Sequence, residues 1–495
     1  MDRVYGLYID DAWYLLLARA LADGQGFTLT NATLPGTLPQ YPPGHPWVMS
    51  LVLRLPLTFA TALVVLKSVA IGAMLAAGML TIVHFRRDRG VPPIAALGLA
   101  LATVASPAFV FFAASTLMSE PLFIALQLAW IVVLEPAPRE RGEPRAALAG
   151  LLAGAAVLVR TLGAAPVAAA GLYLICRRRW RETVAFVGCA ALVVVPWTVH
   201  AALHAPTPEQ QAAVNDSVAY GYATQFWLRL AGNPQFGTIS LADMPIRFGR
   251  LASYFVRVEA GALVAYPWIR MVEANAFYGE GPWRPVLGTA VSVLAVLGLI
   301  RTLRRQVTVA EPAVVATVLM TFMWPFDPFR FILPLLPFLL YYVAKGVEST
   351  ISSLGGWWYG RRVGEVAFAM FIWAVAAINV AGSLVELPGT RPPGTERARW
   401  QAAFDQRETL LAWVRENLPQ DAVIMSNNPA LVHLLTGRKS IGAWDPKTIR
   451  ERLRAAGAHY RADCGVMPSW PLGLSNQRIV HRVPGTELTV IEFTP

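Results

Sequence analysis

Asp10 and Asp11, two adjacent carboxylates close to the start of the chain, are the first residues whose types and spacing suggest chemistry. They precede an apolar stretch at 14–22 that is typical of a helix. A carboxylate in this position could act as a general base that takes a proton from an attacking hydroxyl or amine. Acidic residues also cap helix starts and suit the helix dipole, so a purely structural role stays open for Asp11.

Two further groups of polar residues accompany a bend and the start of an apolar run. Tyr41 and His45 lie in a segment at 40–47 whose prolines and glycine favour a bend, and their side chains could line a polar pocket. A re-entrant turn with an interfacial tryptophan is the structural alternative. Glu120 follows Ser119 at the start of an apolar run, where an N-cap and a first-turn acid are also ordinary.

Basic residues complete the set of candidates. Arg160 lies between two apolar runs, Arg330 follows Asp327 at the edge of another, and Lys67 lies inside a third. An arginine at a membrane edge could simply extend towards lipid headgroups. Ionisable residues in or beside membrane spans, however, usually face a polar cavity and line a substrate path.

The composition defines the surroundings of these residues. Of the 495 residues, 55% are hydrophobic and 15% are charged. Because soluble domains carry about 25% charged residues, the chain is predicted to be a membrane protein with many spans. Much of the net charge of +11 lies in short arginine clusters between apolar runs, as in cytoplasmic loops, so no nucleic-acid partner is expected. The three cysteines indicate neither a disulfide framework nor a metal site.

Apolar runs long enough to span a membrane, or nearly so, occur at about ten places. They lie near 60–84, 92–114, 119–135, 145–160, 163–177, 182–202, 285–303, 310–325, 329–345 and 364–386. Every second connection is rich in arginine, as at 86–89, 139–145, 177–181 and 301–305. The positive-inside rule places these connections in the cytoplasm of a multi-pass protein of the cell's inner (plasma) membrane.

The same topology predicts two domains. A transmembrane domain over 1–387 carries outer loops at 1–58 and 203–284, and a smaller extracytoplasmic domain follows over 388–495. In the smaller domain the apolar pattern predicts a strand at 422–425, a helix ending at Thr436, and closing strands near Val480 and at 488–493. This order indicates a small α/β domain.

Topology brings the charged candidates to one outer face. That face receives Asp10, Asp11, Glu120, Arg160, Asp327 and Arg330, with Lys67 in the outer half of a span. Cations that neutralise a phosphate, together with a carboxylate that activates an acceptor, suit a phosphate-linked donor. A transporter or flippase of lipid-linked or small substrates is the alternative, and a non-catalytic scaffold is a third. No cofactor is implied with certainty, and a divalent metal ion at the carboxylates stays open.

These motifs, in this order, resemble those of the GT-C superfamily of membrane glycosyltransferases. The nearest likeness is to the protein O-mannosyltransferase and lipid A aminoarabinose transferase group, over roughly residues 5–345. The matching motifs are the acidic pair followed by Tyr14, the Tyr-Pro-Pro at 41–43, Ser119-Glu120, the Gly-Leu run that ends in Arg160, and Arg330-Phe331 before Pro-x-x-Pro. The stretch 413–426 also resembles the tail domain of bacterial members.

The resemblance implies a fold, an activity and residue roles. It implies a GT-C membrane fold, a polyprenyl-phosphate sugar donor, an extracytoplasmic lipid, glycan or protein acceptor, and inversion at the sugar carbon. Asp10 would be the catalytic base with Asp11 beside it, and Arg330 and Arg160 would contact the lipid phosphate. From their own positions in the sequence, and not from the resemblance, Glu120, Tyr41, His45 and Lys67 are expected to line the substrate site.

The chain departs from the family pattern at two points. Family members place a membrane helix before the acidic loop, whereas only nine residues precede Asp10 here, so a first helix is expected to be missing. Aminoarabinose transferases carry a lysine before the Pro-Pro pair, and Tyr41 replaces it here. Aminoarabinose as the transferred sugar is therefore not implied.

Overall fold

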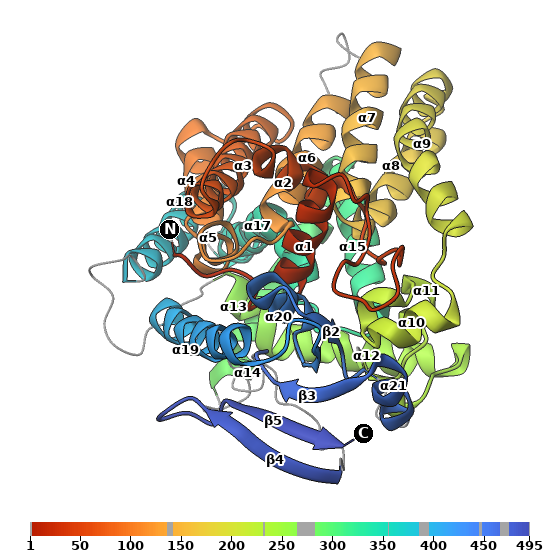
Figure 1. Ribbon diagram of the computed structural model, residues 1–495. Helices are drawn as coiled ribbons and strands as arrows, with labels where there is room; N and C mark the ends of the chain where they lie inside the picture. The colour runs from red at the N-terminus through yellow and green to blue at the C-terminus, as the bar shows by residue number, and fades with distance from the viewer. Residues whose placement is uncertain are drawn as a thin grey trace.

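Every apolar run that the sequence predicts as a span is helical in the computed structural model of the chain (Figure 1). The structure describes residues 2–135, 142–230, 233–264, 283–354, 356–385, 396–444, 448–465 and 475–494. The helices over the apolar runs are α3 (Phe59–Arg87), α4 (Pro93–Val104), α5 (Pro107–Ala114), α6 (Glu120–Leu134), α7 (Glu143–Val159), α8 (Ala164–Cys176), α9 (Trp180–Leu203), α14 (Trp283–Arg305), α15 (Ala310–Met323), α16 (Phe329–Ile332), α17 (Leu336–Leu354) and α18 (Gly356–Val385).

Five helices in the described residues are long and apolar enough to cross a membrane. They are Phe59–Arg87, Trp180–Leu203, Pro285–Arg305, Phe329–Leu354 and Gly360–Leu384. Helices α4 and α5 would add a sixth span if they count as one, because they meet at an angle of 54° where Pro107 starts the second helix. The chain is thus a membrane protein. Ten crossings and an additional first helix stay predictions.

The helices differ in how deeply they lie in the bundle. In the apolar window of Phe329–Leu354, 72% of the residues are buried, against 11% for Trp180–Leu203. Accordingly, α17 packs against α14, α18 and α4, whereas α9 packs mainly against α7 and α8. The bundle therefore has α17 near its centre and leaves most of the apolar surface of α9 for lipid.

Small residues allow the closest helix contacts. A Cβ atom on Gly298 of α14 would overlap the carbonyl oxygen of Tyr342 on α17, and one on Gly346 of α17 would overlap the carbonyl oxygen of Leu294. The two backbones thus approach each other through a reciprocal pair of glycines. Such small-residue contacts are typical of membrane helices, whose association depends on van der Waals packing.

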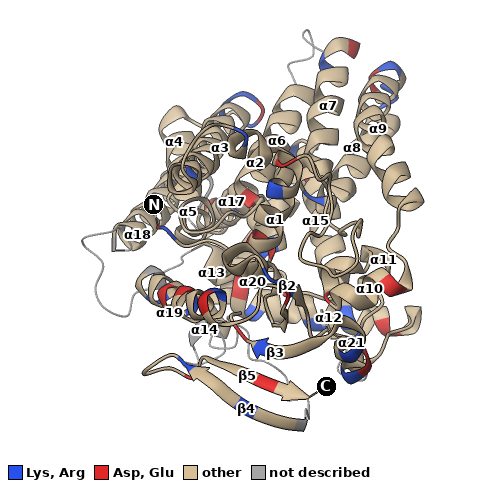
Figure 2. Cartoon of the chain, viewed as in Figure 1, with Lys and Arg blue, Asp and Glu red and all other residues tan. Residues whose placement is uncertain are grey.

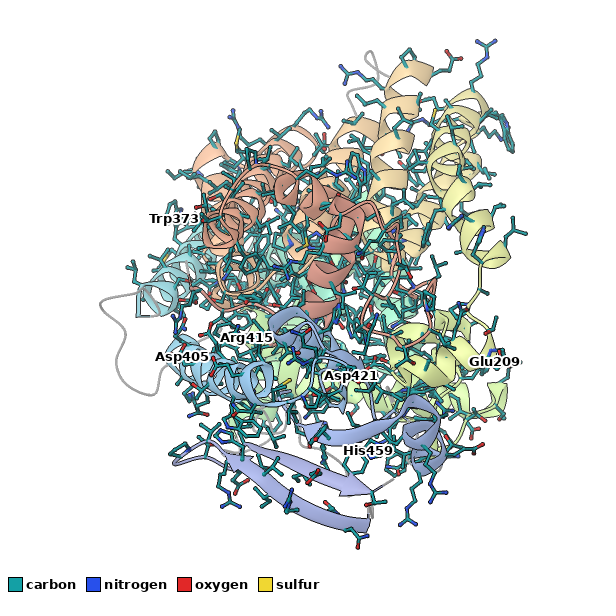
Figure 3. All side chains as sticks on the ribbon, in the orientation of Figure 1. Glu209, Trp373, Asp405, Arg415, Asp421 and His459 are labelled. Carbon is teal, nitrogen blue, oxygen red and sulfur yellow. The ribbon has the colours of Figure 1, made fainter. Side chains whose placement is uncertain are left out.

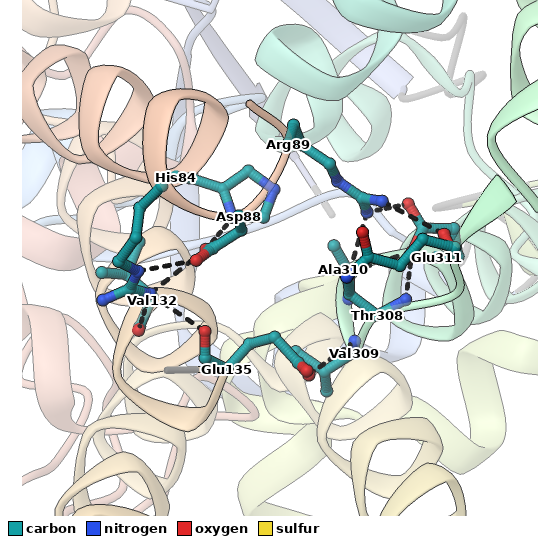
Figure 4. Close-up of polar contacts among 11 residues, drawn as sticks. His84, Asp88, Arg89, Val132, Glu135, Thr308, Val309, Ala310 and Glu311 are labelled. Carbon is teal, nitrogen blue, oxygen red and sulfur yellow. Dashed lines mark hydrogen bonds and ion pairs between the residues drawn. The ribbon is translucent and has the colours of Figure 1, made fainter. Parts of the chain in front are cut away.

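The connections that the sequence predicts as cytoplasmic meet at one end of the bundle (Figure 4). Arg89 after α3 donates to Thr308 at 2.7 Å and pairs with Glu311, both at the start of α15. Glu135 at the end of α6 accepts from the Val309 N–H at 3.1 Å. In Figure 2 basic residues appear at the ends of α3, α7 and α9 that lie away from the C-terminal sheet. Arg139 and Arg141 lie outside the described residues.

The remaining elements lie beyond the other end of the bundle. Before α3 come α1 (Asp10–Ala22) and α2 (Gly44–Leu53). The loop after α9 contains α10 (Pro208–Val214), α11 (Tyr222–Phe226), α12 (Met244–Tyr254) and α13 (Ala260–Val264). The C-terminal region contains α19 (Glu396–Asn417), β1 (Val423–Met425), α20 (Pro429–Thr436), β2 (Lys439–Ile441), α21 (Ile449–Ala456), β3 (Ala458–Ala462), β4 (Ser475–Arg482) and β5 (Thr489–Thr494).

The C-terminal region is built around a sheet of order β2-β1-β3-β5-β4. Strand β1 is parallel to β2 and β3, with Ile424 opposite Ser440 and Tyr460, whereas β5 runs antiparallel to β3 and β4. The predicted strand at 422–425, the helix ending at Thr436 and the closing strands are all present. The predicted domain boundary at 387–388 lies outside the described residues, and the two-domain division stays a prediction.

The first residues of the chain lie between the bundle and this sheet. Helix α1 packs against α2 and against α20 of the C-terminal region (Figure 1). Asn31 Nδ2 donates to the Ser440 carbonyl oxygen at 3.1 Å, and the Ser440 N–H donates back to the Asn31 carbonyl oxygen at 3.0 Å. The N-terminal segment is therefore held from both sides.

The glycine contact between α14 and α17 yields a stability prediction. Gly298→Ala should destabilise the protein by roughly 1–3 kcal/mol, because the added methyl group must push the two helices apart. The midpoint of thermal unfolding in detergent measures this. Gly188→Ala on α9, where a Cβ meets nothing within 4 Å, is the matched control and should not lower the midpoint. Equal midpoints for the two variants would contradict the packing argument.

Candidate active site

Five of the candidate residues converge into one hydrogen-bonded group, the acid–arginine cluster, at the end of the bundle away from the arginine-rich connections. Tyr41 Oη donates to Asp10 Oδ1 at 2.8 Å, and Arg330 Nη1 donates to Asp10 Oδ2 at 3.0 Å. Arg330 Nε also donates to Glu120 Oε1 at 2.9 Å, and Arg160 Nη1 pairs with the same oxygen at 2.7 Å. Residues separated by up to 320 positions thus form one continuous network.

Each member of the acid–arginine cluster stands at the end of an element. Asp10 begins α1, Glu120 begins α6, Arg160 follows the last residue of α7, and Arg330 lies in the short α16. Tyr41 precedes the Pro-Pro-Gly bend that starts α2. Prolines at the starts of α2 and α6 support these ends, since proline fits the first turn but not the interior of a helix. The sequence features that end the helices therefore also place the polar side chains.

The cluster has a buried side and an accessible side. The side chains of Glu120 and Arg160 are 0% and 8% exposed, whereas those of Asp10 and Arg330 are 26% and 20% exposed. Glu120 lies between two guanidinium groups, and such pairing is what makes a buried carboxylate tolerable. A ligand can therefore reach Asp10 and Arg330, while Glu120 stays behind them.

Aromatic rings frame the two arginines. The Arg330 guanidinium lies 4.9 Å from the Tyr8 ring centroid, and that of Arg160 lies 5.7 Å from the Phe331 centroid. Tyr14 Oη accepts from Ser119 Oγ at 3.4 Å, and Ser119 in turn accepts from Arg160 at 3.2 Å. Cation–π contacts of this kind restrain the planes of the guanidinium groups.

Asp11 lies apart from the acid–arginine cluster. Its carboxylate accepts the N–H groups of Gly6 at 3.0 Å, Tyr8 at 3.1 Å and Leu117 at 3.4 Å. Burial raises the pKa of Asp11 to about 6, against the lowering effect of these hydrogen bonds. The structure therefore gives Asp11 contacts that organise the backbone before α1. Its supporting catalytic role stays a prediction.

Lys67 and His45 also contact backbone rather than the cluster. Lys67 Nζ donates to the carbonyl oxygens of Asp2 at 2.5 Å and Val4 at 2.8 Å, inside the protein. His45 Nε2 lies 2.9 Å from the Leu117 carbonyl oxygen, and its ring packs on Tyr14. Asp327 is exposed, and no described ion pair joins it to the cluster. The substrate contacts assigned to Lys67 and His45 stay predictions.

Several residues at the site could not be selected from the sequence. The side chain of Tyr222 in α11 is hydrogen-bonded to the Thr161 side chain. Asp216 lies in the same loop after α9, and its carboxylate accepts the Val218 N–H at 3.1 Å. Burial raises the pKa of Asp216 to about 6, and the charge of Asp10 acts in the same direction. Neither residue belongs to a local motif. Tyr14 could have been selected from the sequence, because a residue four positions after Asp10 lies on the same face of a helix.

The charges of the acid–arginine cluster balance. Two carboxylates, Asp10 and Glu120, face two guanidinium groups, Arg160 and Arg330. An incoming anion must therefore exchange with a carboxylate. Within the described residues, no group of three or more histidine, cysteine or acidic side chains is arranged to hold a metal ion. The chemistry that this arrangement can perform is proton acceptance by Asp10 and stabilisation of an anion by arginine.

His45 provides a pH-dependent test of this arrangement. Burial lowers the pKa of His45 from 6.5 to about 4. At this residue the unfolded chain therefore binds more protons between these values, so the contribution of His45 to stability falls as the pH falls from about 6.5 towards 4. At pH 5 the loss should be about 2 kcal/mol.

The matched variant is His45→Gln, which can still donate to the Leu117 carbonyl oxygen but does not titrate. When the pH is lowered from 7 to 5, the thermal midpoint of the wild type should fall relative to that of His45→Gln. Parallel pH profiles for the two proteins would show that His45 does not titrate as described.

Comparison with known proteins adds the fold family. No protein-family model matches the chain, and no curated protein sequence matches it. Among solved structures, ArnT from Cupriavidus metallidurans in the apo state is similar, with a TM-score of 0.50 and 12% identity over 97% of this chain and 92% of ArnT.

The archaeal oligosaccharyltransferase AglB from Archaeoglobus fulgidus, in complex with an inhibitory peptide and a dolichol-phosphate, is similar with a TM-score of 0.53 and 14% identity. The match covers 92% of this chain, which spans only 65% of AglB. ArnT and AglB are both GT-C glycosyltransferases. The resemblance stated from the sequence motifs is thus confirmed at the level of the fold: the chain has a GT-C fold.

Proposed function

We propose that this chain is a membrane glycosyltransferase that transfers a sugar, with inversion, from a polyprenyl-phosphate donor to an extracytoplasmic acceptor. The observation that carries the proposal is the pair formed by Asp10 and Arg330 at the accessible edge of the acid–arginine cluster. It combines a general base and an anion-binding cation within 3.0 Å, on a GT-C fold. The fold alone would not define an activity, because function depends on the site.

The exposure of the cluster suggests how the donor phosphate binds. Glu120 is fully buried and holds both arginines, so it stays in place. Asp10 is the more accessible partner of Arg330. A phosphate group that approaches Arg330 would therefore replace Asp10 and release its carboxylate. Binding of the donor and freeing of the base are then one event.

The transfer step follows from this exchange. Asp10 takes the proton of the acceptor hydroxyl or amine, and the deprotonated oxygen or nitrogen attacks the anomeric carbon of the sugar. The bond between this carbon and the phosphate oxygen breaks on the opposite face, and the polyprenyl phosphate leaves with the electron pair. Arg330 and Arg160 stabilise the negative charge that develops on the phosphate.

Two further features support a lipid-linked donor and an outer active site. AglB was solved with a dolichol-phosphate, and a polyprenyl phosphate is proposed here as the carrier for this chain. The arginine-rich connections lie at the end of the bundle opposite the acid–arginine cluster. By the positive-inside rule a cytoplasmic location is expected for that end, which supports our proposal that the cluster and the 388–495 domain lie outside the inner membrane.

A reconstituted transfer assay tests the proposal through Asp10. Proteoliposomes receive radiolabelled polyprenyl-phosphate sugars and membrane acceptors. Asp10→Asn should abolish transfer, because an amide cannot accept the proton. The matched control is Asp23→Asn, an exposed acid just after the same helix, which should transfer like the wild type. Undiminished transfer by Asp10→Asn would remove Asp10 from the mechanism. Label that crosses the bilayer without transfer would favour a flippase.

Arg330 gives a second, quantitative test in the same assay. Removal of a charge-stabilising contact of this type typically costs about 3 kcal/mol of barrier, so Arg330→Ala should slow transfer by roughly a hundredfold or more. Arg54→Ala, an exposed arginine at the end of α2, is the matched control. Rates within a fewfold of the wild type for Arg330→Ala would exclude the assigned phosphate contact.

A further inference from the structure

We propose that Asn428, in the C-terminal region, is a positioning residue for the carboxylate of Asp10. Asn428 acts on Asp10 through the segment 2–9, which we call the N-terminal arch. The inference rests on the proposed function and extends it, since it makes a residue more than 400 positions away part of the geometry of the base. It is carried by backbone strain, by buried hydrogen bonds and by one glycine.

The arch ends in a strained residue. Ile9, which directly precedes Asp10, has φ 54° and ψ −66°. A positive φ is rare for any residue with a side chain and is an outlier for a β-branched one. Such strain persists only where surrounding contacts over-determine it, and it clusters at functional sites. The direction in which Asp10 leaves the backbone therefore depends on whatever holds the arch.

Three buried side chains from three different elements hold the arch by its backbone. Lys67 of α3 binds the carbonyl oxygens of Asp2 and Val4. Asp11 of α1 binds the N–H groups of Gly6 and Tyr8. From the C-terminal region, Asn428 Nδ2 donates to the Gly6 carbonyl oxygen at 2.7 Å. Of these three sets of contacts, the last is the one that comes from the C-terminal region.

Gly6 is the point at which the C-terminal region meets the arch. It has φ +76°, and a Cβ there would lie 2.7 Å from Leu431 Cδ1 of α20. Only glycine combines this backbone conformation with so close an approach. The position thus lies directly against α20, four residues before Asp10.

Asn428 is itself rigidly placed. It is fully buried, its Oδ1 caps α20 by accepting the Leu431 N–H at 3.2 Å, and its N–H donates to Ser426 Oγ at 3.1 Å. One amide group therefore starts a helix with its oxygen and fixes the arch with its nitrogen. By contrast, Asp405, which is labelled in Figure 3, forms an ion pair with Arg3 at 2.6 Å, and the side chains of Arg3 and Asp405 are 64% and 45% exposed. Such an exposed pair contributes little.

The two atoms of the Asn428 amide have different roles, and the test variant changes one of them: Nδ2 donates to the Gly6 carbonyl oxygen, and Oδ1 caps α20. Asn428→Asp keeps the oxygen that caps α20, because aspartate is as good an N-cap as asparagine. It removes the side-chain NH2 group that donates to the Gly6 carbonyl oxygen. The matched control is Asn31→Asp, which removes an equivalent buried bond between Asn31 Nδ2 and the Ser440 carbonyl oxygen, away from the arch.

The transfer assay described above measures the effect. Asn428→Asp should lower kcat at least tenfold, leave KM for the polyprenyl-phosphate sugar within about twofold, and shift the acidic limb of the pH–rate profile. Asn31→Asp should leave kcat within about twofold. Ile9→Gly, which makes a positive φ free of strain, should restore part of kcat when added to Asn428→Asp. Equal losses of kcat in Asn428→Asp and Asn31→Asp, or no recovery with Ile9→Gly, would overturn the proposal.

A readout without catalysis separates this inference from the proposed function. In a background with Cys176 and Cys189 changed to serine, Asp10→Cys reports the position of side chain 10 through its rate of maleimide labelling. Addition of Asn428→Asp should change that rate severalfold, whereas addition of Asn31→Asp should not. An unchanged labelling rate would refute positioning by Asn428. Normal transfer by Asp10→Asn together with a changed labelling rate would refute only the proposed function.

Discussion

The structure depends on one constraint: buried charged side chains must be paired with side chains of opposite charge. Glu120 is fully buried, and its carboxylate is held by Arg160 and Arg330. Removal of either partner would leave an uncompensated charge away from water, which costs several kcal/mol. The ends of α6 and α7 and the short α16 must therefore meet at one point. Asp10 and Tyr41 extend this pairing from the buried carboxylate to the accessible edge.

The opposite end of the bundle obeys the same constraint with different residues. Arg89 pairs with Glu311, and Glu135 accepts from the backbone at the start of α15. The two polar networks fix the helix ends, while close backbone contacts such as that between Gly298 and Tyr342 fix the apolar middle.

Much of this organisation could be predicted from the sequence, because apolar runs and arginine-rich connections are local signals. From these signals follow the helical state of the apolar runs, the strands of the C-terminal region and the meeting of five polar residues at one end, namely Asp10, Tyr41, Glu120, Arg160 and Arg330. Asn428, Asp216 and Tyr222 could not be found, since each acts through contacts that depend on tertiary packing. The positive φ of Ile9 could not be predicted either, because isoleucine normally favours the extended conformation of strands.

The neutrality of the acid–arginine cluster has a consequence for selectivity. With two guanidinium groups matched by two carboxylates, the acid–arginine cluster has no net charge. Free phosphate or a water-soluble nucleotide sugar would gain little by approaching it. Under the proposed function, a donor confined to the bilayer would instead reach Arg330 at a high effective concentration. Confinement of the donor to the membrane would then contribute to the selection of the substrate.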